Sequence, residues 1–402
     1  MAKAKKRASK KESLALVCAR INSKYKHPVM CMADELPDTT TLRRPSGIME
    51  LDIHTGGGFP GGAVTVVAGK DQSGKSELCA YCVEMVQRLY KKDTRVAIFA
   101  TEGGLDVDRL RDVGVKIRLS PEEVARKNFA RAAAGVPPLT KEEIGETVGE
   151  IYAGRAPSGD ETLEEILSLI GENICQLIIV DSVTTLFPMA NLGKSLTDSE
   201  KMAAHATMIT RFSNRIGELM SAVRGNNATT VILTQQMRAN QDKANAPTYM
   251  QKSLPNEKPA GAHAFKHIAT VRLLLSEGSR IKKTIKGDKV VVGKTLKWYV
   301  DKGKKGTYNH RTGDAPFYYG GYGFRTGVDR IGSVIVSGIR RGVLAEKPDG
   351  VYLNTVNGSV LAADNLVELR SKIEQDLELE LSIRYAIQAS TGDYRVYREQ
   401  DA

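Results

Sequence analysis

Residues Gly69 to Ser76 carry the backbone and side chains that could hold a nucleotide. The stretch reads G-K-D-Q-S-G-K-S and fits the pattern G-x-x-x-x-G-K-[ST] at every fixed position. In such a phosphate loop the glycines let successive N–H groups point at phosphate oxygens, and the following helix adds the positive end of its dipole. Lys75 would reach the β- and γ-phosphates of ATP, and Ser76 would hold Mg²⁺. The predicted ATP contacts are Gly69, Lys70, Asp71, Gln72, Ser73, Gly74, Lys75 and Ser76. The alternative is a Gly-rich turn between a strand and a helix.

Two carboxylates follow apolar stretches that read as buried strands. Glu102 comes just after residues 95–100, at a strand end beside the phosphate site, where a carboxylate could activate water. A helix cap or a loop acid is the alternative for Glu102. Asp181 ends the apolar stretch 174–181, the Walker-B pattern, in which the aspartate bonds the Mg²⁺ shell.

Positioning these side chains requires an α/β core with an open parallel sheet, and periodicity predicts its elements. Strands are predicted over 28–32, 64–67, 95–100, 174–181, 229–234, 270–275, 290–292 and 295–300, and helices over 12–24, 75–90 and 201–224. A basic turn is expected over 278–289. The C-terminal part is predicted as a helix over 328–341, a hairpin over 350–360 and one amphipathic helix over 365–389.

Three other segments stand apart from this pattern. Residues 119–158 read as an insertion, with helical stretches beginning at Pro121 and Lys141. Residues 189–200 and 239–262 read as loops, and a structureless loop as long as the second is usually functional or disordered. Lys302-Gly303-Lys304-Lys305 projects past a strand end, which composition alone explains as an exposed charged turn.

The composition is that of a basic protein without a disulfide framework. The chain has 402 residues, with 58 Lys plus Arg against 47 Asp plus Glu, a formal charge of +11 and a pI near 9.2. This balance suits a polyanionic partner, although many basic proteins bind none. The first eleven residues are strongly basic and could be a solvated tail or a nucleic-acid arm. Five cysteines, and no apolar run of transmembrane length, indicate a soluble protein of a reducing compartment.

The order of these motifs resembles that of the RecA-type homologous recombinases, which include bacterial RecA and phage UvsX-like proteins. The lead-in S-G-I-M-E-L-D-I-H-T-G-G-G-F-P-G-G before the phosphate loop and the segment I-I-V-D-S-V-T-T-L-F-P carry the likeness, which runs from about Ser46 to Leu361 outside the insertion. The resemblance implies a RecA-like P-loop NTPase core, with a mostly parallel sheet flanked by helices. It also implies a small N-terminal helix-strand arm and a small α+β C-terminal module.

The resemblance implies a role for several further residues at the ATP site. Glu102 becomes the general base for ATP hydrolysis, and Gln236 the sensor that bonds the γ-phosphate. Asp106 and Arg109 would lie near the adenine, although Arg109 stands where bacterial members have a stacking aromatic. Lys302 and Lys304 resemble the pair that reaches into the ATP site of the next subunit, with Lys305 as a third candidate.

The two long loops correspond to the family's DNA loops, which face the filament axis. The DNA contacts predicted there are Lys194, Arg238, Lys243, Tyr249 and Lys252. Phosphate contacts by Lys and Arg are expected to outweigh base stacking. His267 replaces an interface aromatic, and the chain ends without a long acidic tail, which suggests a phage or remote bacterial member.

The sequence therefore predicts a cytoplasmic, ATP- and Mg²⁺-dependent DNA recombinase of a bacterium or phage-infected host. It would form a helical filament on single-stranded DNA and exchange strands with duplex DNA, with single-strand-binding and loader proteins as further partners. Predicted domains are a tail and oligomerisation arm over 1–45, the ATPase core over 46–335 and a small domain over 336–402. The alternatives are a RecA-fold replicative helicase and a non-catalytic paralogue that loads another recombinase.

Overall fold

The computed structural model describes residues 14–24, 42–145, 148–154, 158–191, 202–222, 228–239, 257–259, 262–355 and 358–391. The chain divides into two compact units, Met1–Asp38 and Thr39–Ala402. In the first unit the described element is the helix α1, Leu14–Asn22, on which Leu16 is 60% exposed. The strand predicted over 28–32 and the basic tail lie outside the described residues.

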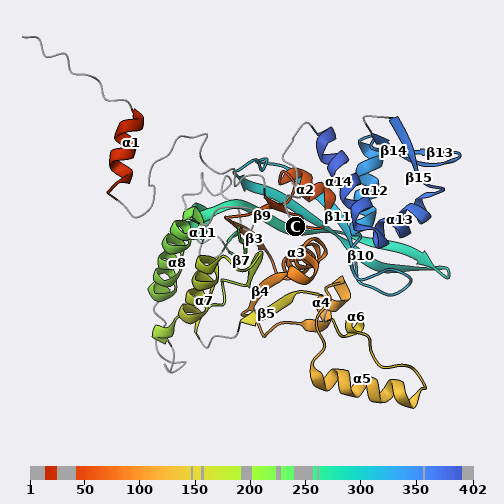
Figure 1. Cartoon of the computed structure of the whole chain (residues 1–402), viewed down its shortest axis with the longest axis horizontal. Helices are drawn as coiled ribbons and strands as arrows, with labels where there is room; N and C mark the ends of the chain where they lie inside the picture. Colours follow the sequence, from red (N-terminus) through yellow and green to blue (C-terminus); the bar gives the residue numbers. More distant parts are fainter. Residues whose placement is uncertain are drawn as a thin grey trace, which may run out of the picture. The chain divides into compact units, whose positions relative to one another are not determined.

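A large mixed sheet forms the centre of the second unit (Figure 1). Six neighbouring strands run parallel, in the spatial order β9, β3, β7, β6, β4, β5. They are β9 (Ala269–Ile285), β3 (Ala63–Gly69), β7 (Thr230–Ala239), β6 (Leu177–Asp181), β4 (Arg95–Ala100) and β5 (Glu150–Gly154). Beyond β9 the strands β10 (Asp288–Gly303), β11 (Thr312–Tyr318) and β12 (Gly327–Val328) continue antiparallel, and β8 (Glu257–Pro259) pairs with β7.

Helices cover both faces of the sheet, because the parallel strands carry apolar side chains toward both sides. On one face α3 (Lys75–Tyr90) and α4 (Val107–Val113) pack against residues such as Val67 and Ile98. On the other face α7 (Gly159–Glu172), α8 (Met202–Ala222) and α11 (Ala262–Ile268) pack against residues such as Val66 and Phe99. The mostly parallel α/β core expected from the sequence is therefore confirmed. None of the described helices combines the length and apolar character needed to cross a membrane.

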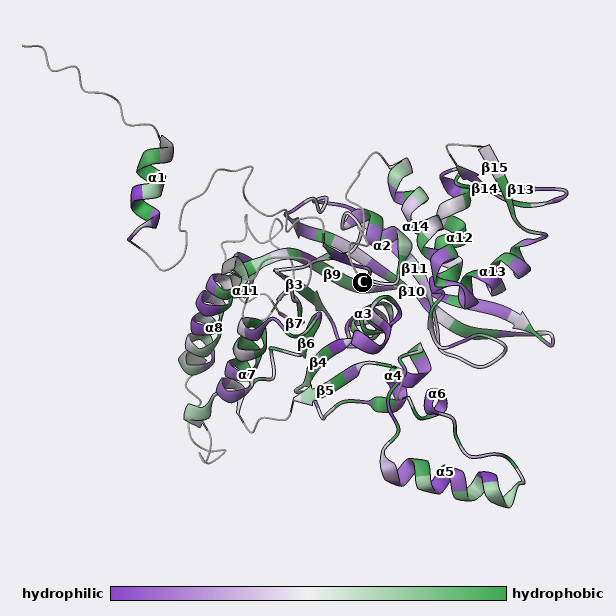
Figure 2. Cartoon of the chain, viewed as in Figure 1, coloured by the Kyte–Doolittle hydropathy of each residue, from purple (hydrophilic) through white to green (hydrophobic). Residues whose placement is uncertain are grey.

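The predicted insertion is partly helical and partly core. Its helices are α5 (Pro121–Ala133) and α6 (Lys141–Ile144), which begin where expected because Ser120 and Thr140 each form a capping box. No residue of α5 is buried, and Figure 2 shows hydrophilic and hydrophobic residues alternating along it. The segment ends in β5, however, which pairs with β4 and ends the described sheet. The sequence pattern did not predict that core strand.

The C-terminal elements pack on α2 (Met49–His54) through Met49 and Ile53. They are α12 (Arg330–Arg340), β13 (Leu344–Lys347), β14 (Gly350–Thr355), β15 (Gly358–Ala363), α13 (Leu366–Gln375) and α14 (Leu377–Ser390). The single helix predicted over 365–389 is wrong, because Asp376 ends α13 and its side chain caps α14 by accepting the N–H groups of Glu378 and Leu379. Because Asp376 accepts the N–H groups of this first turn, α14 begins there as a separate helix.

The basic turn predicted over 278–289 is also wrong. Strands β9 and β10 continue through it as one long antiparallel hairpin, from Val271↔Gly303 out to Ile285↔Asp288. Only Lys286 and Gly287 make the turn, and both have positive φ, 50° and 94°, as a two-residue hairpin turn requires. The outer part of this hairpin is exposed and rich in lysine, so its sequence lacks the apolar pattern by which a buried strand is predicted.

A buried ionic cluster joins α14 to the core helices. Glu380 accepts from Arg384 Nε at 2.8 Å and from Arg88 Nη2 at 2.8 Å, and it also pairs with Arg330. Burial alone would raise the pKa of Glu380, but the arginines outweigh burial and hold it at about 2. Arg384 also contacts Asp52 Oδ2 at 3.1 Å, yet burial raises the pKa of Asp52 to about 6.

Candidate functional site

The carboxyl ends of four parallel strands meet at one edge of the sheet. Register places Gly69 opposite Gln236, and Ala100 opposite Asp181. The candidate phosphate loop, Glu102, Asp181 and Gln236 therefore lie at the same edge, which is where open α/β sheets bind ligands. Folding brings together residues that are up to 167 positions apart in the chain, from Gly69 to Gln236.

The loop between β3 and α3 has a tightly curled backbone. Gly74 has φ 91°, and a Cβ added there would lie 2.7 Å from Leu296 Cδ1 of β10. A Cβ added at Gly69 would lie 2.2 Å from Ser73 Oγ. Ser73 Oγ is buried and has no hydrogen-bond partner among the described residues. A curled loop with such an orphaned hydroxyl fits a phosphate group.

Lys75 begins α3 and turns back over this loop. Its Nζ donates to the carbonyl oxygens of Gly69, at 3.0 Å, and Lys70, at 2.7 Å, and the residue is 8% exposed. A buried ammonium group that already sits across the loop can transfer its hydrogen bonds to phosphate oxygens without moving far.

Asp181 is positioned by two hydroxyl groups. Ser76 Oγ donates to Asp181 Oδ2 at 2.5 Å, and Thr234 Oγ1 of β7 donates to Oδ1 at 2.5 Å. A serine hydroxyl and a carboxylate are hard oxygen donors, which Mg²⁺ prefers, and this ion usually completes its shell with water and phosphate oxygens. Ser76 and Asp181 therefore could hold Mg²⁺ beside a bound phosphate.

Glu102 lies in an exposed turn after β4 and accepts two hydrogen bonds on one oxygen. Ser182 Oγ donates to Glu102 Oε1 at 2.6 Å, and Gln236 Nε2 donates to the same atom at 2.9 Å. The Gln236 backbone is fixed in turn, since its N–H donates to Thr184 Oγ1 at 3.1 Å. By position Glu102 is therefore a loop acid, and two hydrogen bonds tie its carboxylate to residues at the ends of β6 and β7.

The predicted adenine residues make contacts of their own. Asp106 caps α4 by accepting the Arg109 N–H at 2.9 Å. The Arg109 guanidinium pairs with Glu77 Oε1 at 2.9 Å and lies over the Phe317 ring, 5.7 Å from its centroid. Glu77 follows Ser76 directly, so Arg109 lies next to the phosphate loop with its plane held by an ion pair and a ring.

The predicted interface lysines differ in their surroundings. Lys302 lies in β10 and its Nζ donates to the carbonyls of Lys266, at 2.5 Å, and His267, at 3.2 Å, near the end of α11 in the same chain. Partial burial and neighbouring cations lower the pKa of Lys302. Lys304 is exposed, whereas Lys305 Nζ donates to Gly62 O at 3.2 Å.

Of the predicted DNA contacts, the structure describes Arg238 alone, an exposed residue near the end of β7. Lys194, Lys243, Tyr249 and Lys252 lie outside the described residues. Arg238 lies two positions after Gln236 on β7, so DNA bound by Arg238 would lie close to the hydrogen bond between Gln236 and Glu102.

Four further residues contact the predicted site residues, and the sequence did not predict them. They are Ser182, Thr234, Lys294 and Phe317. Ser182 and Thr234 stand at predicted strand ends and could have been found there, since strand ends converge in a parallel sheet. Lys294 and Phe317 come from the antiparallel strands, and no local pattern links them to the loop.

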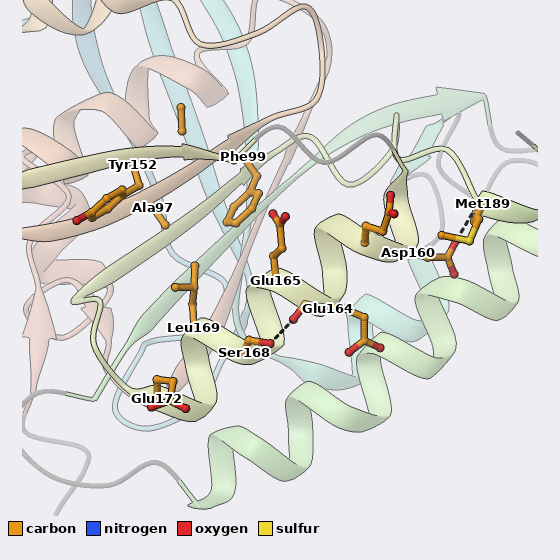
Figure 3. Close-up of a pocket in the computed structure, with 13 residues that line it drawn as sticks. Ala97, Phe99, Tyr152, Asp160, Glu164, Glu165, Ser168, Leu169, Glu172 and Met189 are labelled. Atoms are coloured by element: carbon orange, nitrogen blue, oxygen red, sulfur yellow. Dashed lines mark hydrogen bonds between the residues drawn. The ribbon is translucent and has the colours of Figure 1, made fainter. Parts of the chain in front are cut away.

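A separate groove lies between the sheet and α7 (Figure 3). Its volume is about 740 Å³. Phe99 and Tyr152 lie on the strand side, and α7 brings Glu165, Leu169 and Glu172 on the other side. The groove therefore combines an apolar floor with acidic side chains along its rim, beside the edge strand β5.

A β-strand, curled loop and helix at the carboxyl edge of a mostly parallel sheet define a P-loop NTPase core. Residues 122–321 match the model of a protein family described as "RecA N-terminal domain". Protein RecA of Thermotoga neapolitana is 23% identical over 391 residues, which cover 95% of both chains. Protein RecA of Ehrlichia ruminantium is 23% identical over 361 residues, covering 89% of this chain and 84% of the relative. Protein RecA of Petrotoga mobilis is 26% identical over 256 residues, 63% of this chain and 56% of the relative.

The chain is similar to the RecA-type recombinases, as its motifs led us to expect. The matched domain contains Asp181 and Gln236, and the longer alignments extend the likeness to 95% of the chain.

Proposed function

We propose that this protein is an ATP-dependent DNA recombinase, which assembles on single-stranded DNA, pairs it with homologous duplex and hydrolyses ATP. The hydrogen bond between Gln236 and Glu102 supports the proposal, because it would join the proposed general base, Glu102, to a residue that leads into the segment expected to bind DNA. A single amide thus connects the two activities.

In this proposal the loop backbone and Lys75 bind the phosphates, and bound Mg²⁺ neutralises part of their charge. Glu102 accepts a proton from the attacking water, and Ser182 holds the carboxylate in place through the 2.6 Å hydrogen bond. Gln236 would exchange its bond to Glu102 for one to the γ-phosphate. Glu102 is then released to act only when ATP is present.

DNA binding would affect the hydrogen bond between Gln236 and Glu102 through β7. Arg238 and the segment after it would bind the phosphate backbone of single-stranded DNA, and Gln236 lies on the same strand. Any shift of that strand on binding DNA moves the amide relative to Glu102. Hydrolysis stimulated by single-stranded DNA follows from this connection.

Filament growth would use the groove beside β5. α1 carries the apolar residues Val17 and Ile21 four positions apart, on one side of the helix, and the residues before α1 are basic. The groove offers an apolar floor and an acidic rim, and one side of β5 pairs with no other strand among the described residues, so it could accept a further strand. An arm from one copy on the groove of the next makes a head-to-tail contact that propagates into a helix.

Negative-stain images with and without ATP and single-stranded DNA, combined with ATPase rates, test this function. The proposal expects long helical filaments and an ATPase stimulated by single-stranded DNA. Closed rings that unwind duplex DNA would instead indicate a helicase. Filaments without any DNA-stimulated hydrolysis would indicate a paralogue that loads another recombinase.

A further inference from the structure

Lys294 is a buried cation behind the phosphate loop. It lies on β10, is 8% exposed, and comes from a strand 222 positions away from the loop residue that it contacts. Its ammonium group donates to the backbone carbonyl of Gln72. Glu277 Oε2 lies 3.8 Å from the same nitrogen, and the centre of the Phe317 ring lies 5.9 Å from it. A lysine is rarely buried unless it is paired, and here the carboxylate, the ring and the loop carbonyl are its partners.

The loop needs external support at this point. Gln72 has φ 60°, in the left-handed region that residues other than glycine disfavour. Its side chain is exposed, so packing of the side chain does not hold this conformation. The neighbouring Gly74 is pressed against Leu296, two residues beyond Lys294 on β10. The antiparallel strand therefore supports the loop at two successive places.

The hydrogen bond from Lys294 to the Gln72 carbonyl also orients the N–H group of the next residue, Ser73. A planar trans peptide directs its C=O and its N–H in opposite directions. Because Lys294 takes the Gln72 carbonyl on the β10 side, the Ser73 N–H is turned to the other side, where it donates to the Lys70 carbonyl at 3.2 Å. The Lys70 carbonyl also accepts a hydrogen bond from Lys75 Nζ at 2.7 Å, so the Ser73 N–H faces the side of the loop that Lys75 covers, where phosphate oxygens would bind.

We infer that Lys294 is a positioning residue of the nucleotide site, which fixes the loop backbone at Gln72 and so sets the affinity for nucleoside di- and triphosphates. This inference rests on the proposed ATP site. Its effect falls on binding, because Lys294 holds the loop and does not reach Glu102 or Asp181 in the described contacts.

The test compares Lys294→Met and Lys294→Arg with Lys297→Met, which removes an exposed lysine from the same strand. Calorimetric titration with MgADP, without DNA, should give about tenfold weaker binding for Lys294→Met, which is roughly 1.4 kcal/mol. Lys294→Arg should restore affinity to within about threefold, and Lys297→Met should match the unchanged protein. In ATPase assays the KM for ATP should rise about tenfold in Lys294→Met, while kcat at saturating ATP stays within about twofold.

A general loss of folded protein would lower kcat without changing KM, so this pattern separates positioning from structural support. If Lys294→Met does not fold, Lys294→Gln, which is shorter and uncharged, replaces it with the same expected tenfold loss. Unchanged MgADP affinity in either folded variant would overturn the inference. Lys75→Ala is measured in parallel: if it too leaves MgADP binding intact, the proposed nucleotide site itself is wrong.

Discussion

Gln236 Nε2 donates to Glu102 Oε1 across 2.9 Å, which joins the end of β7 to the turn after β4. Neither residue can change its partner without affecting the other. If the protein hydrolyses ATP in response to DNA, as we propose, this shared hydrogen bond would connect the ATP site to the DNA-binding segment.

Replacing Glu102 with Gln should slow ATP hydrolysis by about 10² to 10⁴-fold, because the amide cannot accept the proton of water. Binding of nucleotide and single-stranded DNA should persist, since the loop and β7 are unchanged. ATPase rates and DNA-binding isotherms measure the two effects separately. Asp108→Asn is the matched control, as Asp108 is an acid on α4 whose side chain is 90% exposed. An unaltered turnover rate would remove Glu102 from the mechanism.

Replacing Lys75 with Ala should abolish ATP-dependent filament assembly, because its ammonium group is the cation that turns back over the loop. Electron microscopy in the presence of ATP and single-stranded DNA gives the readout. Lys92→Ala, at an exposed position beyond the end of α3, should assemble normally. Filaments of normal length and number in Lys75→Ala would contradict the assigned site.

Replacing Lys302 and Lys304 with Ala should reduce ATP hydrolysis only in the assembled protein, if these lysines act on a neighbouring subunit's site. Lys304→Ala is the cleaner single variant, because Lys302 also bonds the α11 carbonyls of its own chain and its loss would affect that helix. Rates are compared with and without single-stranded DNA at matched protein concentration. An equal loss in the free monomer would argue against a shared site.

Reversing charge in the groove, with Glu165→Lys and Glu172→Lys together, should prevent assembly while leaving nucleotide binding unchanged. The acidic rim is expected to attract the basic N-terminal residues of the next copy, and two lysines would repel them. Light scattering at increasing protein concentration follows assembly. Glu122→Lys and Glu142→Lys together, at exposed positions on α5 and α6, make the same charge change elsewhere and should have no effect. Normal assembly of the double variant would rule out this groove as the contact.

Replacing Glu380 with Gln should lower the free energy of unfolding by roughly 3–5 kcal/mol at pH 7, because buried arginines lose their carboxylate. The folded pKa of about 2 lies below the ordinary 4.5, so the contribution of Glu380 is complete above pH 4.5 and is lost as pH falls toward 2. Urea unfolding at pH 7 and pH 3.5 should therefore show a smaller difference between the two proteins at the lower pH. An equal difference at both would contradict the pairing.

Local pattern predicted the strand, loop and helix that contain Lys75, and also the strands that end before Glu102 and Asp181. Those features depend on neighbours in the sequence, where apolar periodicity and glycine spacing are visible. Arg43 and Arg44 are each 1% exposed and donate to backbone carbonyls, which no charge pattern would indicate. Such positions depend on contacts between distant segments.

The same reason explains the other misses. Strand β5 follows two exposed helices and lacks a long apolar run, so it looked like part of an insertion. Lys294 reaches the loop only because β10 folds back beside β9, which itself pairs with β3. The sequence therefore predicted that the candidate site residues lie at the carboxyl edge, but it did not predict that the antiparallel strands support the loop.

Strand exchange between circular single-stranded DNA and homologous linear duplex tests the central claim most directly. With ATP and Mg²⁺ the protein should convert the two substrates into nicked circular duplex and displaced single strand, and Lys75→Ala should yield none. Absence of these products under conditions in which the protein binds single-stranded DNA and hydrolyses ATP would contradict the assignment as a recombinase.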